Sequence, residues 1–234
     1  MPDLSRVRQQ IVSCERCARL RSYCARVAHE KKAAHREDVY WGKPVPGFGD
    51  PGARLLVLGL APAAHGANRT GRVFTGDGSG DFLMRAMHRS GFASIPTSSR
   101  PDDGLVLSGA YIAAAVRCAP PDNKPTREEL QTCQSHLEAE FAQLSRLRVV
   151  VALGKIAFDA WWRVMATKGV AIRPRPEFAH GLRCDINGWP TVIASYHPSR
   201  QNTNTGKLTP SMLDKVFRDA RRILNRPSQI ANDS

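Results

Sequence analysis

The fold is decided by residues 54–77, RLLVLGLAPAAHGANRTGRVFTGD. The apolar run from Arg54 to Leu60 predicts a buried strand, and the glycine-rich residues after it predict a long loop. A helical pattern begins at about Ser79, and Gly91 is placed to end it. A strand, a loop and a helix in this order form the unit of an α/β sheet.

Three further apolar runs predict buried parallel strands at residues 111–117, 148–153 and 191–196. Helical patterns lie between them, and the clearest opens at Thr126 with Glu129 three residues on as a capping box. Another follows Gly154, and the last opens at Thr209 with Pro210 in its first turn. This alternation predicts an α/β sheet with helices on both faces.

One domain is expected over residues 1–226, because a chain of 234 residues with 42% hydrophobic composition can bury one core over most of its length. The proline-rich residues 44–52 predict a rigid loop between an N-terminal helical region and the first strand. Residues 227–234 are predicted to form a disordered tail.

Basic residues dominate the charge of the chain. Lysine and arginine number 34 against 21 aspartates and glutamates, for a net charge of +13. A polyanionic partner is the natural interpretation, and a basic but solvated surface is the alternative. No segment approaches the roughly 18 apolar residues of a membrane span, and the N-terminus lacks the apolar stretch of a signal peptide. We therefore expect an intracellular, cytoplasmic protein without membrane contact, whose 6 cysteines are free, metal-binding or catalytic.

Four of the cysteines form two pairs that can make one ligand set. Cys14 and Cys17 are a CxxC pair, and Cys118 and Cys133 lie either side of fourteen residues. The first pair can reach one metal from a single turn, and a short fold-back can bring the second pair to it. Spacing alone does not separate zinc from an iron–sulfur cluster. For Cys133, an apolar core position on its helix is the alternative.

Two unusual loops follow the carboxyl ends of predicted strands, where ligands bind in parallel sheets. The first loop, residues 59–77, can present backbone N–H groups to an anion or a carbonyl. No Gly-Lys-Ser or Gly-Lys-Thr follows it, which excludes a P-loop nucleotide hydrolase. The second loop, HPSRQNTNTG at residues 197–206, places His197 directly after a buried strand. Its candidates for contact with nucleic-acid phosphates are Ser199, Arg200 and Gln201.

These two loops, the segment CAPPDNKPT at residues 118–126 and the four cysteines together resemble the family-5 uracil-DNA glycosylases. The resemblance covers the chain from about Cys14 to Lys207, and the first loop is a highly specific match. It implies a three-layer α/β/α sandwich around a four-stranded parallel sheet, with the N-terminal helical region tied in by a four-iron four-sulfur cluster (4Fe-4S) on the four cysteines. It also implies removal of uracil and other deaminated or damaged bases from DNA, hypoxanthine among them, in base-excision repair.

A glycosylase holds its target base outside the duplex, so it needs a flat aromatic side chain for stacking and donors for the base edge. By resemblance, Phe74 is the stacking platform, and Asn123 is a candidate to hydrogen-bond the base edge. A core phenylalanine and a turn-forming asparagine are the alternatives. The resemblance also implies that the base carbonyls meet the backbone of Leu60, Ala61, Pro62, Ala63 and Ala64.

Cleavage of the C1′–N bond leaves negative charge on the base and positive charge on the sugar, and both need stabilisation. His197 is the candidate donor to the carbonyl oxygen of the leaving base. Asp77 is the candidate for positioning or activating the attacking water, and a helix N-cap at Asp77 is a compatible structural role. We expect a single-step hydrolase, since nothing marks Lys43, Lys124 or Lys155 as a lyase nucleophile.

Two departures from related families bear on specificity. The first loop begins Gly59-Leu60-Ala61-Pro62, whereas relatives with GQDP or GEAP signatures have an acidic residue there. An alanine run stands where family 4 has an asparagine that selects uracil. With Ala114 at this place we expect broad substrate use, because an unmet hydrogen-bond partner is what rejects a wrong base.

The expected partner is DNA, double- or single-stranded, with the target base flipped out, and the expected state is a monomer. The main alternative is a nucleic-acid-binding protein that holds an iron–sulfur cluster or zinc and has no glycosylase activity. A phosphate-ester hydrolase is disfavoured, because no cluster of acidic metal ligands lies near the strand ends.

Overall fold

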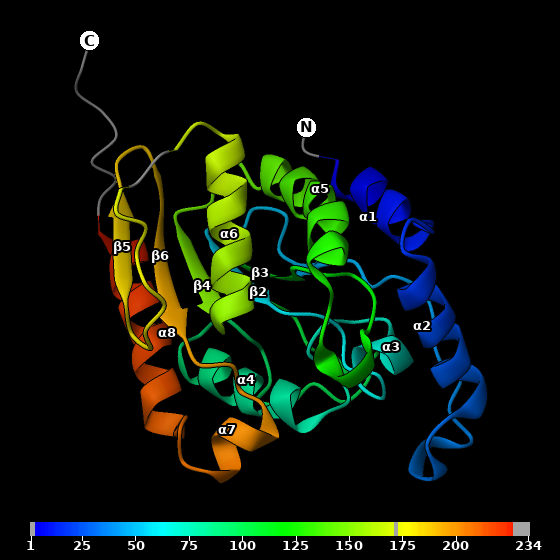
Figure 1. The fold of residues 1–234 in the computed structure, drawn as a ribbon. Helices are drawn as coiled ribbons and strands as arrows, with labels where there is room; N and C mark the ends of the chain where they lie inside the picture. Colours follow the sequence, from blue (N-terminus) through cyan, green and yellow to red (C-terminus); the bar gives the residue numbers. More distant parts are fainter. Residues whose placement is uncertain (1–2, 171–172, 227–234) are drawn as a thin grey trace.

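The computed structural model describes residues 3–170 and 173–226, and it has one six-stranded mixed sheet with the strand order β1-β3-β2-β4-β6-β5 (Figure 1). The strands are β1 (Phe48–Gly49), β2 (Leu55–Gly59), β3 (Ala110–Ala114), β4 (Val149–Leu153), β5 (Arg183–Ile186) and β6 (Trp189–Ser195). The four inner strands run parallel, and both edge strands pair antiparallel. The predicted four-stranded parallel sheet is therefore corrected to a six-stranded mixed one.

The two edge strands carry no apolar run that would predict them. β1 lies within residues 44–52, which were expected to form only a loop, and it pairs Phe48 with Ile112 of β3. β5 alternates exposed and half-buried residues, because one of its faces meets solvent. β3 ends at Ala114 rather than at residue 117, and Val116 beyond it packs around the cysteines.

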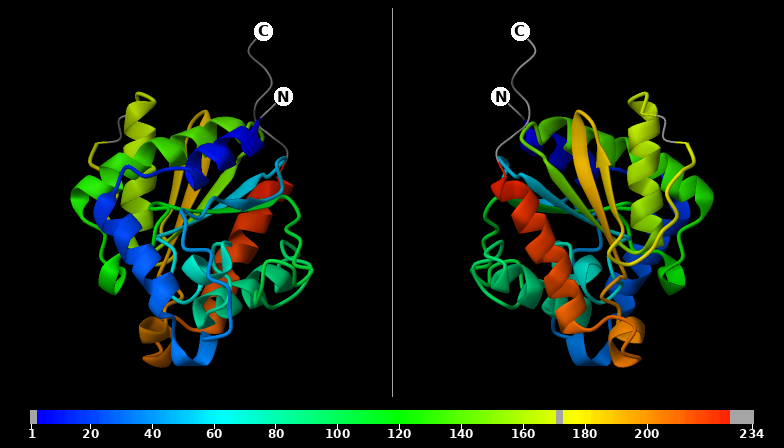
Figure 2. Two further views of the ribbon diagram at one scale, coloured as in Figure 1. Left: turned by 90° about the vertical axis from the view of Figure 1, so that its right-hand side faces the viewer. Right: turned by 90° about the vertical axis from the view of Figure 1, so that its left-hand side faces the viewer.

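Helices cover both faces of the sheet, which gives three layers (Figure 2). Leu55 and Val57 of β2 belong to the core on one face, under α4 (Gly78–Arg89) and α8 (Pro210–Asn225). Leu56 and Leu58 belong to the core on the other face, under α5 (Arg127–Gln143) and α6 (Lys155–Thr167). Alternate side chains of one strand thus serve two cores.

The predicted helix starts are confirmed. Thr126 and Glu129 form the capping box of α5, with both reciprocal hydrogen bonds present. Asp77 caps α4 and Thr209 caps α8, each through its side-chain oxygen. Gly91, just beyond the end of α4, has a φ of +71°, which glycine adopts without strain.

The N-terminal helical region consists of α1 (Leu4–Val12) and α2 (Ala18–Glu30), and α1 packs along α5. The remaining short helices are η1 (Ala33–His35), α3 (Ala67–Thr70), η2 (Pro121–Asn123) and α7 (Arg200–Asn204). Within the described residues, no helix is long and apolar enough to cross a membrane. The predicted tail at 227–234 lies outside the described residues, and the single domain over 1–226 stays a prediction.

Candidate active site

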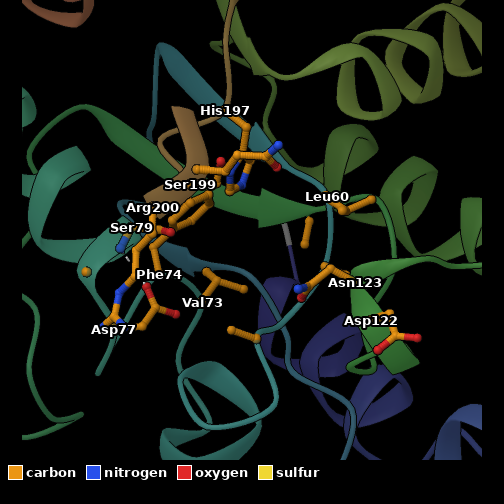
Figure 3. Close-up of a pocket in the computed structure, with 15 residues that line it drawn as sticks. Leu60, Val73, Phe74, Asp77, Ser79, Asp122, Asn123, His197, Ser199 and Arg200 are labelled. Carbon is orange, nitrogen blue, oxygen red and sulfur yellow. Dashed lines mark hydrogen bonds between the residues drawn. The ribbon is translucent and has the colours of Figure 1, made fainter. Parts of the chain in front are cut away.

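A pocket of about 550 Å³ opens at the carboxyl ends of the parallel strands (Figure 3). Three loop segments and the end of β3 build it: the first loop with the start of α4, the residues of η2, and the second loop with the start of α7. The lining residues are Leu60, Ala61, Ala63, Val73, Phe74, Asp77, Gly78, Ser79, Ala114, Asp122, Asn123, His197, Ser199, Arg200 and Gln201.

Most of the predicted substrate, catalytic and DNA-contacting residues therefore meet in one place, and two do not. Pro62 is buried away from the pocket. The carbonyl of Ala64 accepts a hydrogen bond from the Asn68 side chain at 3.4 Å, because the loop turns there into α3.

Four lining residues escaped the sequence analysis: Val73, Gly78, Ser79 and Asp122. Ser79 and Asp122 are neighbours of predicted site residues, so a wider window around each motif would include them. Val73 and Gly78 directly adjoin the predicted residues Phe74 and Asp77, so the same wider window would include them, although an apolar side chain such as that of Val73 is more typical of a core position.

Phe74 is held in a strained backbone conformation at the pocket wall. Its φ is +51°, a left-handed value that is unusual for a bulky residue and typical of functional sites. Gly59 gives the ring room, since a Cβ at that position would lie 2.6 Å from the ring of Phe74. Gly80 does the same for the backbone, because a Cβ there would clash with the Phe74 carbonyl oxygen. These two glycines fix where the aromatic face lies.

Asp77 caps α4 and lines the pocket with the same carboxylate. Its Oδ1 accepts hydrogen bonds from the backbone N–H groups of Ser79 and Gly80, both at 2.9 Å. Within residues 3–170 and 173–226, no group hydrogen-bonds to its Oδ2. Burial raises the pKa of Asp77, and the two N–H donors and Arg200 oppose that rise. One oxygen is thus fixed by the helix, and the other can accept a hydrogen bond from water.

His197 lies just beyond β6, opposite Asn123 across the pocket (Figure 3). Its ring stacks against the ring of Phe74, with centroids 5.8 Å apart and planes at 29°. Asn202 Nδ2 donates to its carbonyl oxygen at 2.8 Å. Burial lowers the pKa of His197 to about 4, so the imidazole is neutral at neutral pH. A neutral imidazole can donate one N–H to an acceptor in the pocket.

The opposite wall comes from η2, which follows β3. Asp122 and Asn123 both have positive φ, 53° and 57°, a conformation that Asp and Asn tolerate better than other side chains. The turn is closed by the backbone N–H of Asn123, which donates to the Pro120 carbonyl at 3.2 Å. The predicted turn role of Asn123 and its place in the pocket are therefore both present.

The second loop forms part of the rim and is not wholly irregular, since it contains α7. Ser199 caps this helix by accepting from the Asn202 N–H at 3.3 Å. Arg200 is exposed and lies beside Gly78, where its positive charge also acts on Asp77. The rim of the pocket therefore carries a cation next to its carboxylate.

A second hollow, of about 480 Å³, adjoins the pocket at Leu60 and His197. Its walls include the apolar rings of Phe178 and Tyr196 together with the amines of Lys155 and Lys207, among other residues. The Lys207 Nζ lies 4.9 Å from the centroid of the Tyr196 ring. A cationic surface thus continues beyond the pocket mouth.

The four predicted cysteine ligands line one small cavity, although they come from three parts of the chain. Cys17 is the N-cap residue of α2, Cys118 follows β3, and Cys133 lies within α5. The backbone N–H of Arg117 donates to Cys133 Sγ at 3.3 Å, and Arg16 Nε donates to Cys14 Sγ at the same distance.

The residues around the cysteine cavity contact the first loop, which forms part of the pocket. Ala61 of the first loop packs against the apolar residues around the cysteines. The carbonyl of Leu60 accepts a hydrogen bond from the Val116 N–H at 2.9 Å, two residues before Cys118. In the described part of the chain, no three His, Cys, Asp or Glu side chains converge closely enough to hold a single metal ion.

Comparison with known proteins gives a consistent result. Residues 46–221 match the family model described as the Uracil DNA glycosylase superfamily. The chain is 47% identical over 224 residues to a type-5 uracil-DNA glycosylase of Mycobacterium leprae, with 95% of each chain covered. It is 49% identical over 215 residues to the type-5 uracil-DNA glycosylase of Thermus thermophilus, covering 92% of this chain and 95% of that one. The corresponding protein of Pyrobaculum aerophilum is 44% identical over 211 residues, covering 90% and 89%.

Proposed function

Because the chain belongs to the uracil DNA glycosylase superfamily, in its type-5 branch, and is a uracil-DNA glycosylase of DNA repair, we propose that Asp77 and His197 hydrolyse the N-glycosidic bond of a base held in the pocket. The proposal rests on one observation. The aromatic face of Phe74, the carboxylate of Asp77 with its free oxygen and the neutral imidazole of His197 all line one pocket. Family membership decides against the alternative of a binding protein without glycosylase activity. Formation of abasic sites in a uracil-containing oligonucleotide tests the proposal.

The pocket suits a base that has left the duplex. A flipped base is read by stacking and by hydrogen bonds to its edge. Phe74 offers the aromatic face, Asn123 offers an amide on the opposite wall, and the backbone near Leu60 can meet the base carbonyls. Arg200 and Gln201 at the rim, with Lys207 of the second hollow, are placed to hold the phosphates of the strand.

The two catalytic groups act on the two charges that develop as the bond breaks. His197 donates its N–H to the carbonyl oxygen of the leaving base, which becomes negative. Asp77 accepts a hydrogen bond from the attacking water through Oδ2 and directs the water toward C1′. Its negative charge also favours the cationic sugar. The water oxygen adds to C1′ and gives up one proton to Asp77 Oδ2, and the electron pair of the C1′–N bond leaves with the base. The base anion then takes up that proton, so the products are a free base and an abasic site.

A hydrolytic mechanism without a covalent intermediate fits the lining of the pocket. A glycosylase-lyase needs an amine nucleophile beside the sugar. Among the described residues that line the pocket there is no lysine. Lys155 lines only the second hollow, and its Nζ pairs with Asp159 at 2.6 Å.

We predict that activity falls on acidification as Asp77 takes up a proton. Burial raises the pKa of Asp77 above its ordinary 3.8, so the loss begins at a higher pH than for an exposed carboxylate. Because burial lowers the pKa of His197 to about 4, the imidazole stays neutral and does not titrate near neutrality. The dependence of kcat/KM on pH with a uracil substrate measures both effects. An acid limb near the ordinary histidine value of 6.5 that vanishes in His197→Ala would contradict this assignment.

We predict that the enzyme releases hypoxanthine as well as uracil, and that Ala114→Asn narrows this range. Ala114 lines the pocket and offers only a methyl group. A base other than uracil therefore leaves no polar side chain at this position without a hydrogen-bond partner, so this position does not disfavour such a base. An asparagine there should lower hypoxanthine release relative to uracil release by about tenfold or more. Ala114→Gly adds no polar group and should keep the broad range. A wild-type enzyme that turns over uracil and leaves hypoxanthine untouched would refute broad specificity.

The cysteine cavity fits a four-iron four-sulfur cluster, which we propose as the resident cofactor. Four thiols from three segments line it, and N–H donors already point at two of the sulfurs. Zinc on the same thiols is the alternative, and it would need all four sulfurs within about 2.3 Å of one point. In a cubane cluster each thiolate binds a different iron, so the sulfurs surround a volume instead of a point. Cys14, Cys17, Cys118 and Cys133 would hold it and tie α2 to the first loop.

We predict that the protein isolated without oxygen is brown and holds roughly four iron and four sulfide per chain. Cys118→Ala should lose the colour and unfold at a lower temperature, because ligand loss removes binding energy that is also folding energy. Cys184→Ala is the matched control, since Cys184 lies in β5 and does not line the cavity. Metal analysis and thermal unfolding give the result, and zinc in place of iron would overturn the cluster assignment.

A further inference from the structure

The cysteine cavity is also lined by two buried side chains whose nitrogens lack hydrogen-bond partners among the described residues. Arg117 is 1% exposed, and neither its Nε nor its Nη1 has a partner among the described residues. His136 is 9% exposed, and its Nε2 also has none there. A buried polar atom without a partner costs free energy, and a buried guanidinium costs more. Both side chains can therefore donate to an acceptor that the described residues do not supply.

The third nitrogen of the Arg117 guanidinium, Nη2, holds the side chain in place. Its Nη2 donates to Glu140 Oε2 at 2.6 Å, and both side chains are almost fully buried. Glu140 Oε1 accepts from the backbone N–H of Gly47 at 2.8 Å and from the Tyr111 hydroxyl at 3.1 Å. Glu140 is thus held by three donors, and the guanidinium that it anchors cannot swing out to solvent. Cys133, His136 and Glu140 lie along one face of α5, so Arg117 lies beside the cysteine cavity.

The other two arginines near the cysteines are already engaged. Arg21 donates to Glu15 and to the Gly42 carbonyl. Arg16 donates to Cys14 Sγ and to Ser135. Among the described residues that line the cavity, the buried nitrogens without any partner are therefore those of Arg117 and His136.

We propose that Arg117 and His136 donate hydrogen bonds to the sulfur atoms of the cluster and raise its reduction potential. This inference rests on the cluster proposed above. Hydrogen bonds to the sulfurs and nearby positive charge stabilise the more negative, reduced form of a cluster over its oxidised form, which is how a protein sets the potential. The cluster in this cavity is consequently easier to reduce, and harder to oxidise, than one held by the four cysteines alone.

The test compares reduction potentials in the complete protein, purified without oxygen. His136→Leu removes one donor, His136→Gln keeps an N–H donor, and the pair Arg117→Gln with Glu140→Gln removes the guanidinium without leaving a buried charge unpaired. We expect lower potentials in His136→Leu and in the double variant, and a smaller shift in His136→Gln. A reductive titration followed by visible absorption and electron paramagnetic resonance measures the potential.

Arg72→Gln is the control for damage to the fold. It also breaks a buried pair, in which Arg72 Nη2 lies 2.7 Å from Asp103, but neither residue lines the cysteine cavity. It should destabilise the protein and leave the potential unchanged. Unchanged potentials in variants that hold the full iron content would overturn the inference and mean that the donors bind water instead. Wild-type protein without iron and sulfide would instead overturn the proposed cluster. If the double variant fails to fold, the potentials of the two His136 variants still show whether a donor in this cavity raises the reduction potential.

Discussion

Asp77→Asn is expected to lower the single-turnover rate of uracil release roughly 10²–10⁴-fold while leaving the fold intact. Asparagine keeps a side-chain oxygen that can cap α4 as well as aspartate does, so the bonds to the Ser79 and Gly80 N–H groups survive. What would be lost is the negative charge at Oδ2, which in the proposed mechanism accepts the hydrogen bond from water and favours the cationic sugar. The substitution therefore separates the catalytic role from the capping role.

Asp81→Asn is the matched control for this prediction. Asp81 lies in the first turn of the same helix but does not line the pocket. Its replacement should leave the rate of uracil release nearly unchanged. Thermal unfolding of both variants checks that the helix is intact, and a binding measurement with uracil DNA checks that the substrate still enters. If Asp77→Asn kept the wild-type rate, the assignment of the water to Asp77 would be wrong.

His197→Ala is expected to lower the same rate roughly 10²–10³-fold, the usual cost of losing one donor to a developing anion. The proposed donor is a neutral imidazole, because burial lowers the pKa of His197 to about 4. Its partner, the base carbonyl oxygen, gains negative charge only as the bond breaks, so the loss should appear mainly in kcat rather than in binding.

His197→Gln tests that explanation, since its amide can donate an N–H from a similar position and should recover part of the rate. His88→Ala is the control, because His88 is exposed on α4 outside the pocket. A His197→Ala variant whose loss lies wholly in KM would show that His197 only binds the substrate.

The starts of α4, α5 and α8 could be predicted because each depends on neighbouring residues. The capping box at Thr126 and Glu129 and the cap at Asp77 act over three residues, and the structure has all of them. The loops at the strand ends were predictable for a related reason, since parallel strands bring their carboxyl ends to one edge whatever the details of the helices.

The features that sequence could not predict depend on distant contacts. Phe74 has a left-handed backbone conformation, and the room for its ring and its carbonyl comes from Gly59 and Gly80, which belong to different elements. β5 is a strand because β6 pairs with it, although its own residues show no apolar run. The unused donors of Arg117 become visible only when Glu140, far along the chain, is seen to take its other nitrogen.

The most direct test of the central claim counts products in a single turnover on a duplex with one uracil. The wild-type enzyme should release one free uracil for each abasic site, and the strand should break only after treatment with alkali. In Asp77→Asn, free uracil and abasic sites should fall together. Strand breaks without alkali, or uracil release by Asp77→Asn at the wild-type rate, would contradict hydrolysis directed by Asp77 in this pocket.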